Sequence, residues 1–135
     1  MAAWAAPSPG DIVWCHFPEI PDRRPGPKPR PALVVRVDQH EDGIAVAVVY
    51  GTSKRTTQLK AGEFAIRSEC GDAYRLAGLS HDTKFDFKVV VDLPWTDAFF
   101  KVPPGAPCGQ KPQLGTLHPA LFRAAAAANK AAGER

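Results

Sequence analysis

Residues 32–37 and 44–50 read ALVVRV and IAVAVVY, two apolar and β-branched runs separated by the polar stretch DQHEDG. Such residues favour strands, and a short polar connection that ends in Asp-Gly favours a reversal of the chain. The two runs therefore predict an antiparallel β-hairpin with its turn over residues 38–43.

The pairing register of this hairpin decides which side chains share a face. If Asp38 lies opposite Ile44, then Arg30 lies opposite Thr52 at the open end of the hairpin, and their side chains point to the same face. A slip of one residue would place the two side chains on opposite faces. A site that combines Arg30 with Thr52 thus depends on this register.

The rest of the chain also favours short strands joined by turns. Its 135 residues are 44% hydrophobic and include 14 prolines and 11 glycines, which suits one strand-rich domain over residues 1–135. We expect the core of this domain at about residues 9–101. It would contain further strands at 11–17 and 62–67, a short helix or irregular turn at 68–77, and one strand or a bent pair at 84–93.

The C-terminal part reads differently from the core. Residues 102–116 form a Pro/Gly-rich connection, and an alanine-rich segment predicts a helix over residues 117–132. His118 or Thr116 can cap this helix, with Pro119 at its first position and Gly133 after its end.

The cysteines and the charge narrow the class of function. Three cysteines cannot all pair and show no metal-binding spacing, which indicates a reduced, cytoplasmic setting and no metal site. We find no apolar run of signal-peptide or membrane-spanning length, so we expect neither export nor membrane association. The formal net charge of +3 permits a polyanionic partner without requiring one.

Basic residues gather on both sides of the hairpin. They are Arg23, Arg24 and Lys28 in the proline-rich loop 18–31, and Lys54, Arg55 and Lys60 after the second run. Two basic loops can flank one groove, although a charge cluster of this size is often only a solvated surface. Trp14 and His16 lie in the first predicted strand, which is apolar on both faces, and we expect them in the core.

Three motifs stand in order along the chain: PGDIVW at residues 9–14, KPRPALVV at 28–35 and VVYGTS at 48–53. In these motifs the chain resembles the MazF/PemK family of type II toxins, the PemK-like growth inhibitors. Residues 77–79 and 84–86 resemble the family's later strands, and the terminal helix resembles its closing helix. The resemblance implies a mainly β fold, an SH3-like barrel of bent antiparallel strands with a C-terminal helix, that works as a homodimer.

The resemblance also implies an activity and a site. Most members of the family cut single-stranded RNA without a metal or another cofactor, and a paired antitoxin protein blocks them by laying a segment in the RNA groove. Arg30 and Thr52 match the family's catalytic arginine and threonine, because they lie in the Arg-Pro-Ala and Thr-Ser motifs. The implied partners are therefore RNA and an antitoxin.

These assignments agree with the chemistry of the side chains. Attack of an RNA 2′-hydroxyl on the adjacent phosphate builds negative charge, and the guanidinium fork of Arg30 can hold two phosphoryl oxygens. Thr52 can orient a hydroxyl or a phosphate oxygen, but an unperturbed threonine is a poor base. Proton transfer needs a third group, for which the candidates by side-chain type are His81, Asp82, Glu19 and His16. The RNA-binding candidates are Arg23, Arg24, Lys28, Ser53, Lys54 and Arg55.

Two segments depart from the family's pattern. Residues 20–29 are proline-rich and basic where better-known members carry a Gly-rich, acidic or His-bearing stretch, and residues 80–83 read SHDT instead of the commoner Cys-Asp-Gln run. The alternative functions are therefore non-catalytic: an RNA-binding regulator, or a protein inhibitor like the related toxins of this fold that bind a topoisomerase.

Overall fold

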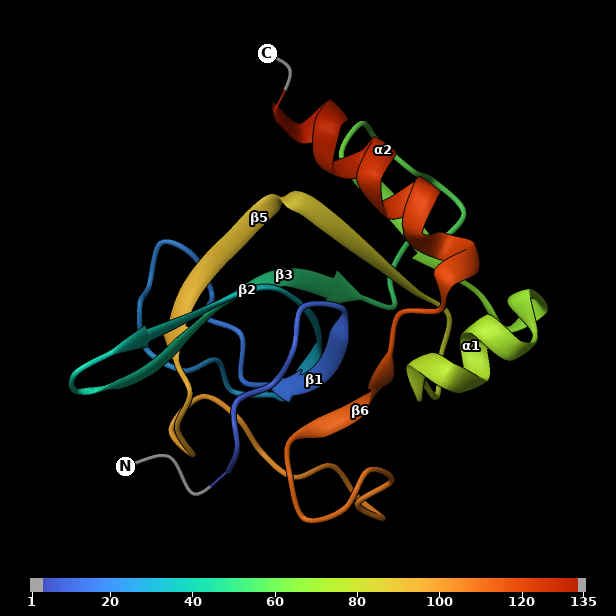
Figure 1. Ribbon diagram of the computed structural model, residues 1–135. Coiled ribbons are helices and arrows are strands. Elements are labelled where there is room, and N and C mark those ends of the chain that lie inside the picture. Colours follow the sequence, from blue (N-terminus) through green and yellow to red (C-terminus); the bar gives the residue numbers. More distant parts are fainter. Residues whose placement is uncertain (1–3, 134–135) are drawn as a thin grey trace.

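The computed structural model describes residues 4–133, and its main element is a six-stranded antiparallel sheet in the order β4-β5-β3-β2-β1-β6 (Figure 1). The strands are β1 Asp11–Cys15, β2 Arg30–His40, β3 Gly43–Thr52, β4 Glu63–Ile66, β5 Thr83–Pro94 and β6 Gln113–Thr116. Short 3-10 helices, Ser68–Cys70 and Pro119–Leu121, precede α1 Asp72–Ala77 and α2 Phe122–Gly133.

The mainly β fold with bent antiparallel strands and a C-terminal helix is confirmed. β5 bends sharply where its register against β3 shifts: Val49 lies opposite Val90, but Tyr50 lies opposite Asp86 (Figure 1). The first part of β5 thereby lies between β3 and β4, while its second part continues along β3. Among the described strands β4 and β6 form the two edges of the sheet, so the barrel is open.

The central strands are buried on both faces, as the apolar pattern of the first predicted strand indicates. One core lies between the sheet and the helices and includes Ile12, Leu33, Val49, Phe85, Ala77, Ala125 and Ala128. The other core lies on the opposite face of the sheet and includes Val13, Val34, Val48, Leu93, Trp95 and Phe100. Two cores hold β1, β2 and β3 in place, and these are the strands that carry the predicted site.

The hairpin turn predicted over residues 38–43 is wrong. β2 and β3 are connected by residues 41 and 42 alone, and Asp38 lies opposite Ala45 instead of Ile44. Residues 38–40 are polar because this end of the hairpin projects away from the rest of the molecule (Figure 1). Their polarity does not interrupt the backbone pairing, since ladder hydrogen bonds do not require apolar side chains.

The predicted register is nevertheless present at the open end of the hairpin. A β-bulge at residue 35 shifts the pairing by one residue, and beyond it Ala32 lies opposite Tyr50. Two further residues along each strand bring Arg30, the first residue of β2, opposite Thr52, the last residue of β3. Opposed residues of an antiparallel pair share a face, so the condition for a joint site holds.

The predicted connection 102–116 is the largest error in the fold, because its last four residues form β6. The sequence Gln-Leu-Gly-Thr has little strand propensity of its own. Pairing with β1 and close packing against α1 define the strand instead: a Cβ added at Gly115 would lie 2.1 Å from the carbonyl oxygen of Leu76. The first predicted strand, 11–17, ends earlier, at Cys15.

The contact between α1 and β6 yields a prediction of stability. Gly78 ends α1 with φ 71°, and a Cβ there would lie 1.9 Å from the carbonyl oxygen of Leu114. We expect Gly78→Ala to lower the free energy of unfolding by about 3 kcal/mol, since a left-handed alanine costs ~1–2 kcal/mol and forced overpacking adds ~1–3 kcal/mol. Urea denaturation measures this loss.

Gly105→Ala is the matched control for that substitution. Gly105 has φ 79°, but an added Cβ there would meet nothing within 4 Å. Only the cost of the left-handed conformation, ~1–2 kcal/mol, should be measured. Equal losses for the two variants would contradict the close packing of α1 on β6.

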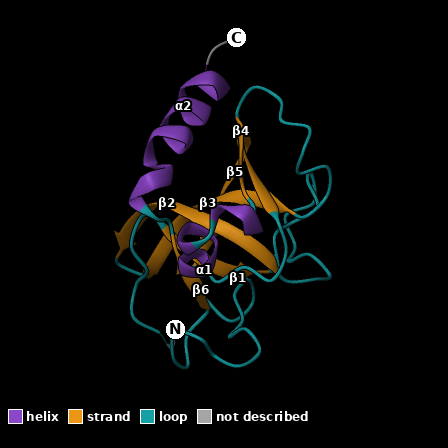
Figure 2. Cartoon of the chain, turned by 90° about the vertical axis from the view of Figure 1, so that its right-hand side faces the viewer, coloured by secondary structure: helices purple, strands orange, loops and turns teal. Residues whose placement is uncertain are grey.

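The terminal helix predicted over residues 117–132 is present as a 3-10 turn followed by α2. His118 caps it, because its Nδ1 accepts a hydrogen bond from the backbone N–H of Ala120 at 2.9 Å, and Pro119 follows as the first residue. Gly133, which was predicted to follow the helix, is instead the last described residue of α2. α2 covers β4 and β5 (Figure 2).

Within residues 4–133 no helix has the length and hydropathy to cross a membrane.

Candidate active site

The open end of the hairpin forms one wall of a pocket of about 500 Å³, here called the main pocket. Arg30 lines it from β2, Thr52 and Ser53 from the end of β3, and His81 from the segment between α1 and β5. The three predicted catalytic residues come from separate parts of the sequence, and the fold brings them to one pocket. Its volume is in the range of ~300–1,000 Å³ typical of ligand sites.

Arg30 lies between the main pocket and a second one. The second pocket, of about 210 Å³ and here called the side pocket, is lined by Phe17, Glu19, Tyr50 and Arg30 among others. Arg30 is half-buried, and its guanidinium makes no hydrogen bond or ion pair with residues 4–133. A half-buried cation that lines two pockets and has no side-chain partner among the described residues is suited to hold an anion.

Thr52 already makes one local hydrogen bond. Its Oγ1 accepts from the backbone N–H of Lys54 at 3.2 Å, which is the turn contact expected of a threonine at a strand end. A hydroxyl has one donor and two acceptor lone pairs, so the proton of Thr52 and one lone pair stay available to the pocket. Ser53 beside it is exposed and adds a second hydroxyl to the same wall.

The segment after α1 holds His81 at the main pocket. The His81 ring is exposed, and its Nδ1 lies 3.1 Å from the Ser80 hydroxyl oxygen. Asp82 faces a different partner: its Oδ1 accepts from the backbone N–H of Ser68 at 2.7 Å, and it is not among the residues lining the main pocket. Asp82 therefore anchors the segment, while His81 is the titratable group nearest to the site.

Glu19 shares the side pocket with Arg30 and does not line the main pocket. The loop that carries it is tied to the end of β1, because His16 Nδ1 donates to the carbonyl oxygen of Gly26 at 2.9 Å and the N–H of Gly26 donates back to His16 at 3.1 Å. His16 is half-buried and satisfied, close to its predicted role. Glu19 and His81 thus lie in different pockets, with Arg30 common to both.

The basic loop before β2 contributes less to the site than its charge suggests. Arg24 makes an exposed ion pair with Asp22 at 2.8 Å, and the side-chain hydrogen bond from Arg24 lowers the pKa of Asp22 to about 2. Arg23, Arg24 and Lys28 are all exposed and do not line the main pocket. Lys54 and Arg55 are exposed as well, but they directly follow Thr52 and Ser53 in sequence.

Several residues that line the main pocket could not be identified from the sequence pattern. Trp14 is half-buried in the pocket wall rather than in the core, because it lies opposite Pro31 at the open end of the hairpin. Three prolines of the predicted connection, Pro103, Pro104 and Pro107, form another part of the wall. Proline-rich segments have no periodicity that would indicate what they face, so this contribution requires the fold.

Cys15 lies opposite Arg30 in the β1–β2 pair, but the thiol is unsuited to chemistry. Burial raises the pKa of the Cys15 thiol far above its usual value, so the thiol stays protonated. In the described part of the chain, no group of three or more His, Cys, Asp or Glu side chains is placed to hold a metal ion. The polar side chains at the two pockets are thus Arg30, His81 and Glu19, together with the hydroxyl-bearing Thr52, Ser53, Ser80, Thr83 and Tyr50.

The comparison with protein families identifies the class of protein. Residues 8–93 match the family described as PemK-like, MazF-like toxin of type II toxin-antitoxin system. Because the match covers more than half of the chain, the chain belongs to this family. The matched segment includes Arg30, Thr52 and His81, and it ends before the prolines of the pocket wall and before α2. A search of curated proteins finds no match.

Proposed function

We propose that this toxin-family protein is an endoribonuclease that cuts single-stranded RNA without a metal ion. The observation that carries the proposal is the position of Arg30, half-buried, without a partner among the described residues, and shared by two pockets next to Thr52. A cation in this position can stabilise the negative charge of a phosphoryl transition state.

The proposed reaction uses the RNA's own 2′-hydroxyl as the nucleophile. The bond from the 2′-oxygen to phosphorus forms, the bond from phosphorus to the 5′-oxygen breaks, and the products carry a 2′,3′-cyclic phosphate and a 5′-hydroxyl. Arg30 binds two non-bridging oxygens of the phosphate, where negative charge develops. Thr52 donates its remaining proton to an oxygen of the same phosphate.

Proton transfer is assigned to the two titratable groups on either side of Arg30. An in-line displacement places the attacking and leaving oxygens on opposite sides of phosphorus. Arg30 cannot accept a proton, because arginine stays charged in proteins. Glu19 in the side pocket is therefore the proposed base for the 2′-hydroxyl, and His81 in the main pocket is the proposed acid for the 5′-oxygen.

We expect His81→Gln to lower kcat by about 100-fold, because general acid catalysis contributes ~10²–10⁴-fold. Glu19→Gln should lower kcat by a similar factor, because it removes the proposed base. His40→Gln is the control, since His40 is exposed at the tip of the hairpin. Cleavage by His81→Gln at the rate of His40→Gln would reject the assignment of His81.

The proposed path of the RNA runs from the main pocket across Arg30 to the side pocket. Lys54 and Arg55 follow the main-pocket wall and are the proposed phosphate contacts on that side, with Ser53 between them and Thr52. In the side pocket Tyr50 packs edge-to-face on Phe17 with 5.1 Å between ring centroids. Aromatic walls of this kind accept unstacked bases of single-stranded RNA.

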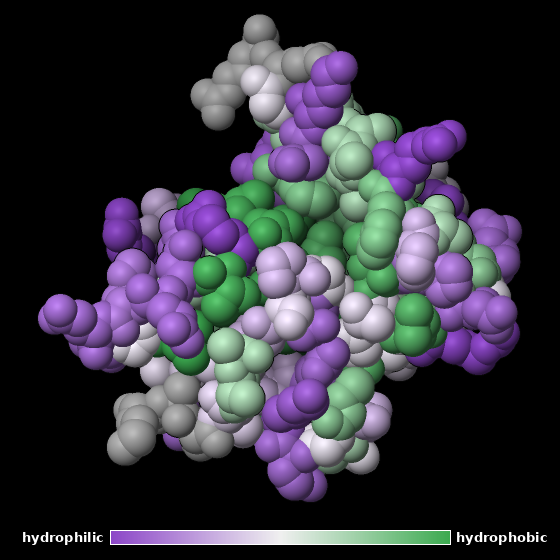
Figure 3. Space-filling model, viewed as in Figure 1, coloured by the Kyte–Doolittle hydropathy of each residue, from purple (hydrophilic) through white to green (hydrophobic). Residues whose placement is uncertain are grey.

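The proposed partners are a second copy of the chain and an antitoxin, and the proposed setting is the cytoplasm. Large apolar side chains are exposed on the outer surface, with Val90 at 42% and Phe122 at 54%, and Figure 3 shows hydrophobic surface in the hollow between α2 and the bend of β5. A dimer would cover such a surface. Sedimentation equilibrium tests it, and a mass of 14.5 kDa at all concentrations would reject the dimer.

Purified protein incubated with single-stranded RNA in EDTA should cut it. The non-catalytic alternatives rest on the two segments that depart from the family's pattern, residues 20–29 and 80–83. Binding of RNA with a steep salt dependence but no cleavage would favour an RNA-binding regulator. Intact RNA together with a stable complex with a topoisomerase would favour a protein inhibitor.

A further inference from the structure

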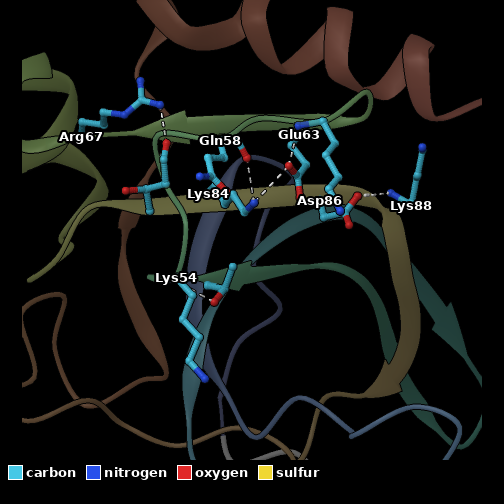
Figure 4. Close-up of polar contacts among 10 residues, drawn as sticks. Lys54, Gln58, Glu63, Arg67, Lys84, Asp86 and Lys88 are labelled. Carbon is cyan, nitrogen blue, oxygen red and sulfur yellow. Dashed lines mark hydrogen bonds and ion pairs between the residues drawn. The ribbon is translucent and has the colours of Figure 1, made fainter.

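A buried ion pair lies directly beside Thr52. Lys84 Nζ is 3.1 Å from Glu63 Oε1, and both side chains are only 8% exposed (Figure 4). Lys84 on β5 lies opposite Thr52 on β3, so the two side chains share a face of the sheet. The pair is therefore next to the proposed catalytic threonine without lining the main pocket.

Both members of the pair also bind the loop that connects β3 to β4. Lys84 Nζ donates to the carbonyl oxygen of Gln58 at 3.1 Å, and Glu63 Oε1 accepts from the backbone N–H of Lys60 at 2.7 Å (Figure 4). Burial acts to raise the pKa of Glu63, but the hydrogen bonds from Lys60 and Lys84 outweigh it, and the pKa lies below its usual value. The carboxylate stays charged, as the pairing requires.

A third side chain holds the same loop. The Arg67 guanidinium, just after β4, donates through Nη2 to the carbonyl oxygen of Thr56 (Figure 4). The loop backbone is thus bound at residues 56, 58 and 60 by charged side chains of the sheet. The loop's own side chains are mostly exposed and contribute little packing, so these polar contacts define its path.

Stability alone does not account for the pair. Removing two charges from water is costly, and an apolar pair of similar size is commonly at least as stabilising in a buried position. What the pair provides is direction: it binds backbone groups of a mostly exposed, polar loop whose one large apolar side chain, Leu59, is itself 45% exposed. That loop begins at Thr52 and carries the exposed cations Lys54 and Arg55.

We propose that the Lys84–Glu63 pair positions this RNA-binding loop. It holds residues 53–60 so that Lys54 and Arg55 lie beside Thr52, and it thereby sets the affinity for RNA without touching RNA. This inference rests on the proposed function. Lys84 and Glu63 are positioning residues, so their loss affects KM for RNA more than kcat.

The test is the double substitution Lys84→Met with Glu63→Leu. It removes both buried charges together, leaves the net charge unchanged and avoids an uncompensated charge in the interior. We expect KM for single-stranded RNA to rise about tenfold, the cost of ordering a freed loop, with kcat within about twofold of the wild type. Amide hydrogen exchange of residues 54–61 should increase by at least as large a factor.

The matched control is Arg36→Met with Asp92→Asn. It also removes one cation and one anion of an ion pair, with 2.8 Å between Arg36 Nη2 and Asp92 Oδ1, but that pair is exposed and joins β2 to β5 away from the loop. Its KM and the exchange of residues 54–61 should equal those of the wild type.

The outcomes separate the two proposals. Wild-type cleavage of RNA with an unchanged KM in the Lys84 and Glu63 double variant overturns the positioning role and leaves the proposed function standing. Equal rises in KM for this double variant and for the control variant also overturn the positioning role. If the wild-type chain neither binds nor cuts RNA, the proposed function fails and the positioning role fails with it.

Discussion

Arg30→Ala should cut RNA about 1,000-fold more slowly than the wild type. Removing one preorganised group that stabilises transition-state charge costs ~10²–10³ in kcat, and removing an arginine from a phosphoryl-transfer site costs ~10³–10⁵. The Arg30 guanidinium makes no hydrogen bond or ion pair with the described residues, and the Ala substitution keeps the backbone pairing of Arg30 with Cys15, so the fold should stay intact. The measurement is the rate of cleavage of a fluorescent single-stranded RNA under single-turnover conditions.

Two further variants define what Arg30 contributes. Arg30→Lys keeps the charge but cannot bind two phosphoryl oxygens in parallel, and we expect it to stay about 100-fold below the wild type. Arg24→Ala removes a cation that is exposed, paired with Asp22 and outside the main pocket, and it should cleave within about twofold of the wild type. Cleavage by Arg30→Ala at the rate of Arg24→Ala would contradict the role of Arg30.

Lys84→Met alone should lower the free energy of unfolding by about 3–5 kcal/mol. The substitution leaves the Glu63 carboxylate buried without its cation, and breaking one side of a buried ion pair costs that much. Replacing Glu63 as well should recover most of the loss, because no uncompensated charge then remains. Urea denaturation of the single and double variants measures both effects.

Arg36→Met is the control for this substitution. Arg36 pairs with Asp38 and Asp92, but its side chain is 58% exposed. Exposed ion pairs contribute ~0–1 kcal/mol, so a loss in this range is expected. A similar loss for Lys84→Met and Arg36→Met would show that water reaches the Lys84–Glu63 pair.

The hairpin and its register were accessible from the sequence because runs of apolar, β-branched residues and the polar stretch between them are local signals. They predicted that Arg30 and Thr52 share a face, although the predicted turn was too long and a β-bulge at residue 35 compensates for it. The bulge has no signature in the run ALVVRV. The correct result at the open end therefore depended on a feature that the pattern does not show.

Features that depend on tertiary packing could not be predicted. β6 has little strand propensity and exists because β1 and α1 accommodate it. Lys84 alternates with apolar residues along β5, which indicates an exposed position, yet the loop before β4 covers it. The separation of Glu19 and His81 into two pockets likewise follows from loop positions that the sequence does not define.

The most direct test of the account is the chemical identity of the RNA ends after cleavage in EDTA. Attack by the 2′-hydroxyl, with Arg30 holding the phosphate, predicts fragments that end in a 2′,3′-cyclic phosphate and begin with a 5′-hydroxyl, and no cut at a residue whose 2′-hydroxyl is replaced by hydrogen. Fragments with a 3′-hydroxyl and a 5′-phosphate, or RNA that stays intact, would contradict it.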